Sequence, residues 1–255
     1  INYLSFIGSA KVGWHLRRAA ADGTRMGLEH GGNAPAIVAA DADLEKTARI
    51  CLTGGYYHAG QVCVSVQRLY VQRAVADEFI ALYKPMVESL KVGDPTRDDT
   101  DVGPLIRPRE VERVDQWVQD AAAGGTQILS GGHKLDHNCY APTLLLGAKP
   151  GMDVVDKEVF GPVVALFVYD EIEEAIQAAN AGPSGFQAAV FTGAIDTAFK
   201  AARSLDFSAV MVNDSTAFRV DWMPFGGRNQ SGLGMGGVKY SIEEMTQLKL
   251  IVLNL

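Results

Sequence analysis

The sequence predicts an α/β protein built around a largely parallel sheet. Segments with the apolar period of a helix alternate with short runs rich in β-branched residues through most of the chain. The chain has 255 residues, of which 47% are hydrophobic, so it can bury a substantial core without disulfides or metals. Strands joined through helices are expected to form right-handed crossovers.

Helices are expected where apolar residues recur on one face, over residues 76–90, 111–122 and 172–179. Asp170 is placed to cap the start of the third helix. Strands are expected over the β-rich runs at residues 68–72, 163–169, 188–192 and 209–213. This alternation is typical of parallel sheets, whose neighbouring strands need crossover connections.

Two regions break the alternation. Residues 1–28 predict a strand, a Gly-Ser turn and a helix, a single βα unit with no neighbours of its own. Residues 247–255 form an isolated apolar run that predicts a lone strand. Because unpaired strand edges tend to associate, we expect this strand to pair with a partner subunit or with a segment outside this sequence.

Charge and composition argue against several classes of partner. The net charge of -7 disfavours nucleic acid and anionic membrane surfaces, because both are bound through clustered Lys and Arg. Apolar runs such as residues 161–168 are too short to span a bilayer. Three irregularly spaced cysteines indicate free thiols in a reducing compartment, so we expect a cytoplasmic protein.

Cys63 is the strongest candidate for a nucleophile. It follows Gly60-Gln61 where an apolar helical run should end, so its thiol could be partly exposed at a turn. A neutral thiol needs a base or oriented amides to react. Glu29, between an apolar run and Gly31-Gly32, could serve as that base at the end of a strand, although this motif alone favours an ordinary solvated or N-cap glutamate.

The other two cysteines favour structural roles. Cys51 lies on the apolar face of a helical pattern, as buried free cysteines commonly do. Cys139 lies near His133 and His137, which invites a zinc interpretation, but no fourth ligand is nearby and the segment resembles a variable loop. We therefore expect no metal site.

Two further segments suggest ligand contacts. Glu158 and Phe160 would project to the same side of an extended strand before Gly161-Pro162, where one could bind a sugar hydroxyl and the other could stack on a flat ring. A strand-edge glutamate and a core phenylalanine are equally compatible with these residues. Gly8-Ser9 precedes a helix whose free amides suit a phosphate, although the full dinucleotide fingerprint is absent.

Six short motifs occur along the chain. They are FIGS (6–9), LEHGG (28–32), GQVC (60–63), EVFGP (158–162), VMVN (210–213) and PFGGRNQSG (224–232), and Cys63 lies 34 positions after Glu29. Together and in this order, they resemble the C-terminal, catalytic part of the aldehyde dehydrogenase superfamily.

The resemblance implies a covalent mechanism. Cys63 would attack an aldehyde to form a thiohemiacetal, NAD or NADP would take the hydride, and Glu29 would activate the water that cleaves the thioester. Gly8 and Ser9 would contact the cofactor's pyrophosphate, Glu158 its nicotinamide ribose and Phe160 the nicotinamide end. His30 and Ile7 depart from the family's usual Leu and Thr beside the cofactor.

The resemblance also implies a substrate class and a quaternary structure. Tyr57 and Phe218 match walls of the aldehyde tunnel, and the branches closest in pattern act on small lactaldehyde-type or phosphonoacetaldehyde-type substrates. Arg219 could pair with an anionic end of the substrate, or could be an ordinary exposed arginine. The C-terminal strand would mediate homo-oligomer formation.

The implied division is a remnant of the dinucleotide-binding domain (1–28), a catalytic domain (29–238) and an oligomerisation segment (239–255). Most of the dinucleotide-binding fold is missing from this sequence, so the chain alone is expected to fold but to fail in hydride transfer. Two alternatives remain open: a non-enzymatic assembly module with a vestigial thiol, and a cofactor-independent cysteine esterase or hydrolase, for which His58 is the nearest candidate partner of Cys63.

Overall fold

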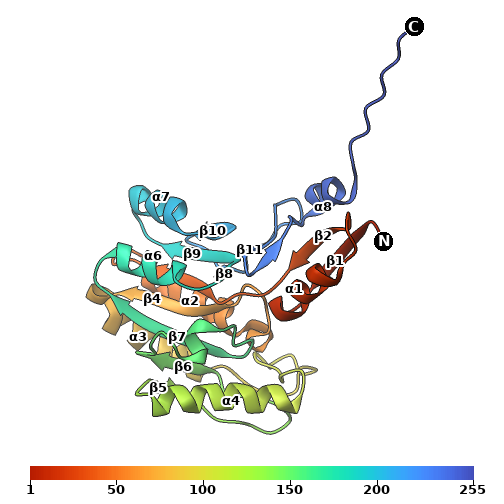
Figure 1. Ribbon diagram of the computed structural model, residues 1–255. Coiled ribbons are helices and arrows are strands. Elements are labelled where there is room, and N and C mark those ends of the chain that lie inside the picture. Colours follow the sequence, from red (N-terminus) through yellow and green to blue (C-terminus); the bar gives the residue numbers. More distant parts are fainter.

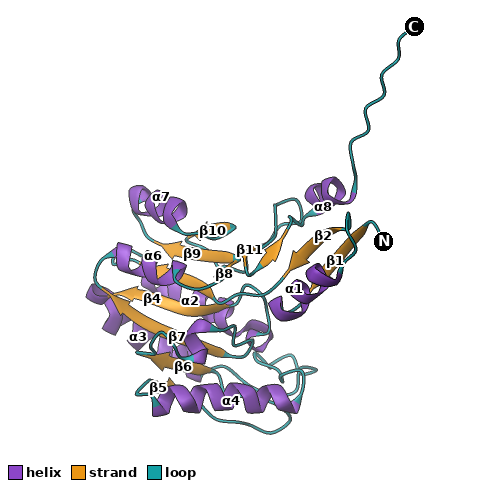
Figure 2. Cartoon of the chain, viewed as in Figure 1, coloured by secondary structure: helices purple, strands orange, loops and turns teal.

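A seven-stranded sheet forms the centre of the computed structural model, which describes residues 1–255 (Figures 1 and 2). Neighbouring strands are parallel throughout, except that β5 is antiparallel to β6. This confirms the predicted α/β class with a largely parallel sheet. In sheet order the strands are β10 (Ala209–Val212), β9 (Gln187–Phe191), β3 (Ala34–Val38), β4 (Val66–Gln72), β7 (Val163–Tyr169), β6 (Thr143–Leu146) and β5 (Gln127–Ser130).

Helices cover both faces of this sheet, so central strands such as β3 and β9 are buried at every residue. The larger core lies under α2 (Leu44–Tyr56), α3 (Arg73–Glu88) and α4 (Pro108–Ala123). The smaller core lies under α6 (Ile172–Asn180) and α7 (Ile195–Ser204). The three predicted helices are therefore confirmed as α3, α4 and α6.

The predicted cap of α6 is wrong by one residue. Glu171 is the N-cap, and its side chain forms a capping box with that of Glu174. Asp170 instead accepts a hydrogen bond at 3.0 Å from Arg73 at the start of α3. A carboxylate beside a helix start can cap that helix or pair with a distant arginine. Asp170 pairs with Arg73 and leaves the cap to Glu171.

A second, three-stranded sheet contains the N-terminal unit. Strand β1 (Tyr3–Ile7) continues into α1 (Ala10–Ala19) and pairs in parallel with β2 (Arg25–Glu29). The short β12 (Gly232–Leu233) returns from the other end of the sequence and pairs antiparallel with β2. The expectation that this unit has no neighbours is therefore wrong. Because β2 runs across residue 28, the division of domains there stays a prediction.

A short two-stranded ladder joins this sheet to the larger body. Strand β8 (Ser184–Gly185) pairs antiparallel with β11 (Arg228–Asn229), and a four-residue helix, α5 (Asp153–Asp156), precedes β7. No helix is long and apolar enough to cross a membrane. The chain between β11 and β12 thus lies beside both sheets, close to the end of β2.

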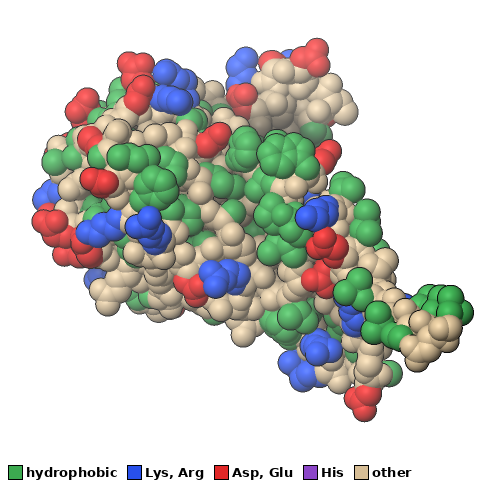
Figure 3. Space-filling view, turned by 90° about the horizontal axis from the view of Figure 1, so that it is seen from above, with side chains coloured by type: hydrophobic (Ala, Val, Ile, Leu, Met, Phe, Trp, Pro, Cys, Tyr) green, Lys and Arg blue, Asp and Glu red, His purple; other side chains and the backbone are tan.

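The C-terminal segment extends away from the body after α8 (Val238–Met245) (Figure 1). Residues 246–255 form no strand within this chain, and their apolar side chains are exposed. Figure 3 looks down on this end of the molecule, where apolar side chains lie open among the charged ones. Pairing of the predicted strand with a partner subunit remains a prediction.

Candidate active site

The loop that carries Cys63 begins with an unusual left-handed turn. After α2 ends, the short 3-10 helix η1 (Tyr57–Gly60) places His58, Ala59 and Gly60 at φ values of 50°, 56° and 69°. A Cβ on Gly60 would lie 2.0 Å from the carbonyl oxygen of Gly161, so only glycine fits there. This turn reverses the chain and leaves Cys63 half-buried at a turn, as the sequence predicts.

Hydrogen bonds hold the loop in place on both sides of the thiol. The side chain of Gln61 donates to the carbonyl of Pro104 at 3.2 Å and accepts from the amide of Ile106 at 2.9 Å. On the other side, the buried hydroxyl of Thr216 donates to the carbonyl of Val64 at 2.6 Å. The segment after β10 is thereby fixed beside the loop that carries Cys63.

Glu29 is the last residue of β2. Its carbonyl accepts a hydrogen bond from the amide of Gly8 at 3.1 Å. This bond connects the end of β2 to the turn before α1. Its carboxylate lies against Gly236, where a Cβ would be 2.4 Å from Oε1. Burial raises the pKa of Glu29, and the charge of Arg219 opposes this rise.

Glu158 is more deeply buried. Its Oε1 accepts a hydrogen bond from the amide of Gly32 at 3.2 Å. Burial raises the pKa of Glu158 to about 7, although the bond from Gly32 and the charge of Arg113 oppose this rise. At neutral pH, small changes in the surroundings therefore change its charge.

The predicted extended strand around Glu158 and Phe160 is not formed. These residues belong to a loop between α5 and β7, and Phe160 has a left-handed φ of 48°, which breaks the alternation of an extended chain. Both side chains nevertheless reach the same cavity, because the loop curls around it.

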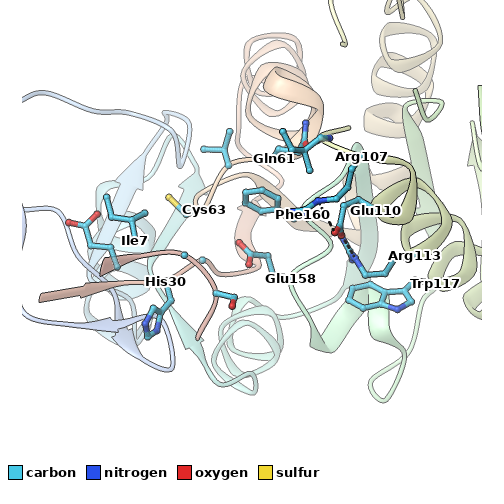
Figure 4. A pocket seen from close by; sticks show the side chains of 16 residues that line it. Ile7, His30, Gln61, Cys63, Arg107, Glu110, Arg113, Trp117, Glu158 and Phe160 are labelled. Carbon is cyan, nitrogen blue, oxygen red and sulfur yellow. Dashed lines mark hydrogen bonds and ion pairs between the residues drawn. The ribbon is translucent and has the colours of Figure 1, made fainter. Parts of the chain in front are cut away.

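One cavity of about 610 Å³ unites most of the predicted site residues. Figure 4 shows Cys63, Glu158 and Phe160 at its centre, with Ile7 and His30 on one side and residues of α4 on the other. The predicted residues that line it are Gly8, Ser9, Glu29, Cys63, Glu158 and Phe160. The structure thus brings together a thiol, two carboxylates and a helix start from four separate parts of the chain.

The cavity keeps the free thiol of Cys63 protonated at neutral pH. Burial, and then the charges of Glu158 and Glu29, raise the pKa of Cys63 to about 11. Burial also raises the pKa of Cys51 and of Cys139, and neither of these lines the cavity. Cys63 is therefore the thiol with access to the cavity and with bases beside it.

The three predicted tunnel residues lie outside this cavity. Tyr57 is half-buried, and burial and then the charge of Cys63 raise the pKa of Tyr57 to about 12, so it lies near the thiol. Phe218 is 45% exposed. Arg219 is exposed and stacks on Phe225, with Cζ 4.2 Å from the ring centroid.

Residues of α4 and the loop before it form a wall that the sequence reasoning missed. Arg113 donates to Glu110 at 3.0 Å and to the carbonyl of Val159 at 2.7 Å, and it stacks on Trp117 at 4.6 Å. Arg107 and Ile106 complete this wall. The spacing of residues 110, 113 and 117 places them on one face of α4, and this spacing could have predicted the wall. The apolar stripe on another face of the same helix is the stronger pattern in the sequence.

The cavity has groups that suit the phosphate and nicotinamide ends of a dinucleotide. Ser9 is the exposed N-cap residue of α1 and its side chain makes no capping bond, so the amides of Ala10 and Lys11 at the helix start are free to bind a phosphate. A Cβ on Gly31 would lie 1.7 Å from Oε1 of Glu158, so glycine there leaves room for a carboxylate that can accept from a hydroxyl. Phe160, 40% exposed, offers an aromatic face.

Comparison with known proteins agrees with this arrangement. The model of the aldehyde dehydrogenase family matches residues 1–251. The chain is 46% identical over 255 residues to 3-sulfolactaldehyde dehydrogenase of Priestia megaterium, covering 100% of this chain and 53% of the relative. It is 41% identical over 254 residues to lactaldehyde dehydrogenase of Methanocaldococcus jannaschii, covering 100% of this chain and 54% of the relative.

Solved structures show the same fold. The NADP complex of glyceraldehyde-3-phosphate dehydrogenase GapN from Methanocaldococcus jannaschii has a TM-score of 0.93 at 41% identity, covering 98% of this chain and 54% of that one. The NADP complex of the NADP-dependent glyceraldehyde-3-phosphate dehydrogenase from Bacillus halodurans has a TM-score of 0.95 at 37% identity, covering 100% and 53%. The chain spans about half the length of the relatives it matches.

Proposed function

The chain belongs to the aldehyde dehydrogenase family, and from this premise we propose that the whole protein oxidises a small aldehyde to its carboxylic acid with NAD or NADP. One observation carries the proposal: Cys63, Glu29 and Glu158 line one cavity that also reaches the start of α1. A nucleophile, a base and a phosphate-binding helix start are the parts that this reaction needs.

The chemistry divides between Cys63 and Glu29. The Cys63 thiol first gives its proton to water in the cavity, and the thiolate then attacks the carbonyl carbon. The resulting thiohemiacetal anion loses a hydride to become a thioester. Bound NAD or NADP supplies the hydride acceptor. Glu29, whose pKa burial raises, takes a proton from the water that attacks the thioester. The products are the carboxylic acid and the free thiol, so aldehyde, water and oxidised cofactor become acid, reduced cofactor and one proton.

The cofactor would lie along the cavity from α1 toward the thiol. Gly8 and Ser9 would hold its pyrophosphate at the free amides of α1. Glu158 would accept from hydroxyls of the nicotinamide ribose, and Phe160 would pack at the nicotinamide end. The neighbouring structures with NADP support this assignment, because they share the fold over nearly the whole chain. The contacts of this half alone are few, so we expect the 255-residue chain by itself not to transfer hydride.

Substitution of the two catalytic residues in the whole protein tests the proposal. Cys63→Ser should abolish formation of reduced cofactor, whereas Cys139→Ser, on a buried thiol outside the cavity, should leave it unchanged. Glu29→Gln should keep a rapid first burst of reduced cofactor and slow the later turnover, because only the hydrolysis step needs the carboxylate throughout. Full turnover by Cys63→Ser, or no turnover by the unmodified protein with any small aldehyde, would overturn the proposal.

We infer further that the aldehyde is small and polar or anionic, bounded by Tyr57 and Phe218 and paired with Arg219. The guanidinium of Arg219 stacks on a ring and acts on Glu29 from a distance, and it makes none of the ion pairs found in the chain. A relative that is named for sulfolactaldehyde, whose sulfonate is an anion, supports this substrate class.

We propose also that the protein is a cytoplasmic homo-oligomer. All three cysteines are unpaired, which suits a reducing compartment. The exposed apolar side chains of residues 248–255 support association through the C-terminal segment. The substrate is a small molecule, and the net charge of -7 gives no support to a nucleic-acid or anionic-membrane partner.

A further inference from the structure

His30 lies where β2, helix α1 and the loop at residues 230–231 meet, and its side chain is 1% exposed. Its backbone amide donates to the carbonyl of Ser231 at 2.9 Å, and its Nδ1 lies 2.9 Å from the carbonyl oxygen of Gln230. Because a carbonyl oxygen can only accept, Nδ1 carries the proton of the neutral ring. Nε2 is therefore left with a lone pair and acts as an acceptor.

This free nitrogen faces helix α1. A Cβ on Gly13 would lie 1.8 Å from Nε2, so the helix can approach the imidazole only because residue 13 is glycine. The Trp14 ring packs edge-on at 5.3 Å with an interplanar angle of 78°, and Phe6 from β1 lies at 6.2 Å. The imidazole is thus enclosed by both elements of the N-terminal βα unit.

Two buried polar atoms in this cluster have no hydrogen-bond partner, namely Nε2 of His30 and Nε1 of Trp14. The indole N–H can only donate, and the imidazole nitrogen can only accept. Leaving both unpaired in a buried site is unfavourable, whereas pairing them satisfies both at once. The two ring centroids lie 5.3 Å apart in an edge arrangement, so the two unpaired atoms belong to neighbouring rings.

We propose that the Trp14 Nε1–H donates a hydrogen bond to Nε2 of His30, and that this pair is a positioning device that fixes helix α1 against the strand of Glu29. The helix start at Ser9 and the base at Glu29 line the same cavity, and Gly8 is bonded to the Glu29 carbonyl. His30 adds a second, polar connection one turn further along α1. A leucine at position 30 would fill the space but offer no acceptor.

The pair can be tested on the 255-residue chain by NMR of isotope-labelled tryptophan. The chain has three tryptophans, so Trp14→Phe assigns the Trp14 indole signal, and Trp117 and Trp222 serve as internal references. His30→Leu should shift the Trp14 indole N–H signal and speed its exchange with solvent, while the references stay unchanged. His30→Gln, which keeps an acceptor, should restore slow exchange. An unmoved Trp14 signal in His30→Leu would overturn the pair.

The positioning role is tested by amide hydrogen exchange on the same variants. His30→Leu and Trp14→Phe should each speed exchange in α1, and combining them should add little, because both remove one bond. Helix α6, which packs on the seven-stranded sheet and not on the sheet that adjoins α1, is the internal control and should not change. Unchanged exchange in α1 would show that the pair holds nothing in place.

The consequence for cofactor binding rests on the proposed function. In the whole protein, either substitution should raise the KM for the cofactor about three- to tenfold with little change in kcat, as expected for one lost hydrogen bond. An unchanged KM would overturn the link to the cofactor. If the unmodified protein oxidised no aldehyde, the proposed function would fail, and the NMR and exchange results would still decide whether the pair exists and holds α1.

Discussion

The carboxylate of Glu158 occupies the space that a side chain on Gly31 would need, since a Cβ there would lie 1.7 Å from Oε1. The next amide, that of Gly32, donates to the same oxygen at 3.2 Å. The Gly31-Gly32 pair therefore allows a buried acid to lie beside Cys63. In this arrangement Glu158 raises the pKa of the thiol more than Glu29 does.

We expect Glu158→Gln to make Cys63 more reactive. The amide keeps the shape of the carboxyl group but removes a charge that opposes thiolate formation. The midpoint of the pH–rate profile for alkylation of Cys63 by iodoacetamide should therefore fall, with the modified thiol identified by mass spectrometry. Glu78→Gln, on the exposed face of α3, is the control and should leave the midpoint where it was. An equal midpoint in both variants would contradict the expectation.

The same substitution should change how stability depends on pH. In the folded protein the pKa of Glu158 is about 7, above its ordinary value of 4.5, so the native state holds this proton more tightly than the unfolded state. The stability that Glu158 contributes is complete below its ordinary pKa of 4.5. It is lost as pH rises through the folded-state pKa of about 7, by on the order of 3 kcal/mol. Glutamine cannot ionise and avoids this loss.

Urea unfolding of the parent and of Glu158→Gln at about pH 5 and about pH 8 measures the effect. The difference in free energy of unfolding, variant minus parent, should be larger at about pH 8 than at about pH 5. Glu29 has a raised pKa in the parent and is retained in the variant, so the comparison largely removes its contribution. A difference that does not change with pH would argue against a buried, titrating Glu158.

Gly60 should be among the least replaceable glycines of the site. Gly60→Ala combines a left-handed backbone (φ 69°) with a Cβ 2.0 Å from the Gly161 carbonyl oxygen. We expect a loss of about 3 kcal/mol in the free energy of unfolding, from strain and overpacking together. Gly147→Ala separates the two causes, because Gly147 has φ 75° and open space around it. That control should lose only about 1 kcal/mol, and equal losses would show that the Gly161 contact is unimportant.

Local patterns predicted the regular elements better than the connections between them. The apolar stripes of α3, α4 and α6 are set by nearby residues, and the run at 163–169 has the same bounds as β7. The pairing of β2 with β12 joins residues about two hundred positions apart, and nothing in the local sequence of either strand specifies it. The left-handed φ of Phe160 is equally invisible in a run of strand-forming residues.

The site was predicted in the same uneven way. Cys63 and Glu29 stand out because each adjoins glycines at the end of an apolar run. The wall from α4 was missed, since Glu110 and Arg113 read as an ordinary charged helix face until the fold brings them to the cavity. His30 departs from the resembled pattern, but its role depends on Gly13 and Trp14, which only the packing of α1 brings to it.

The C-terminal segment should be needed for self-association. Six large apolar side chains of residues 248–255 are more than 70% exposed, and both faces of the predicted strand are largely apolar. Deletion of residues 247–255 should therefore lower the oligomeric mass measured by light scattering, or lower solubility if the partner surface is left open. Lys249→Ala, which removes a charge but no apolar surface, is the control. An unchanged, soluble assembly after the deletion would count against this role.

The charge of Arg219 should be detectable at Cys63 without any cofactor or aldehyde. Iodoacetate and iodoacetamide alkylate a thiol in the same way and are nearly equal in size, but only iodoacetate is an anion. Glu29 and Glu158 repel an anion that approaches Cys63, and Arg219 is the cation whose charge reaches Glu29. The ratio of the two alkylation rates therefore reports the local potential that an anionic substrate would meet.

Arg219→Gln should lower the iodoacetate-to-iodoacetamide rate ratio at Cys63 about twofold, because the charge of Arg219 acts on Glu29, which lines the same cavity as the thiol. Arg203→Gln is a matched control, because Arg203 also stacks on a phenylalanine, Phe199 at 5.4 Å, but lies on α7 away from the cavity. Its ratio should equal that of the parent, and raising the salt concentration should reduce the difference between the two variants. If Arg219→Gln left the ratio unchanged, Arg219 would be an ordinary surface arginine, and the preference for an anionic aldehyde would lose its structural basis.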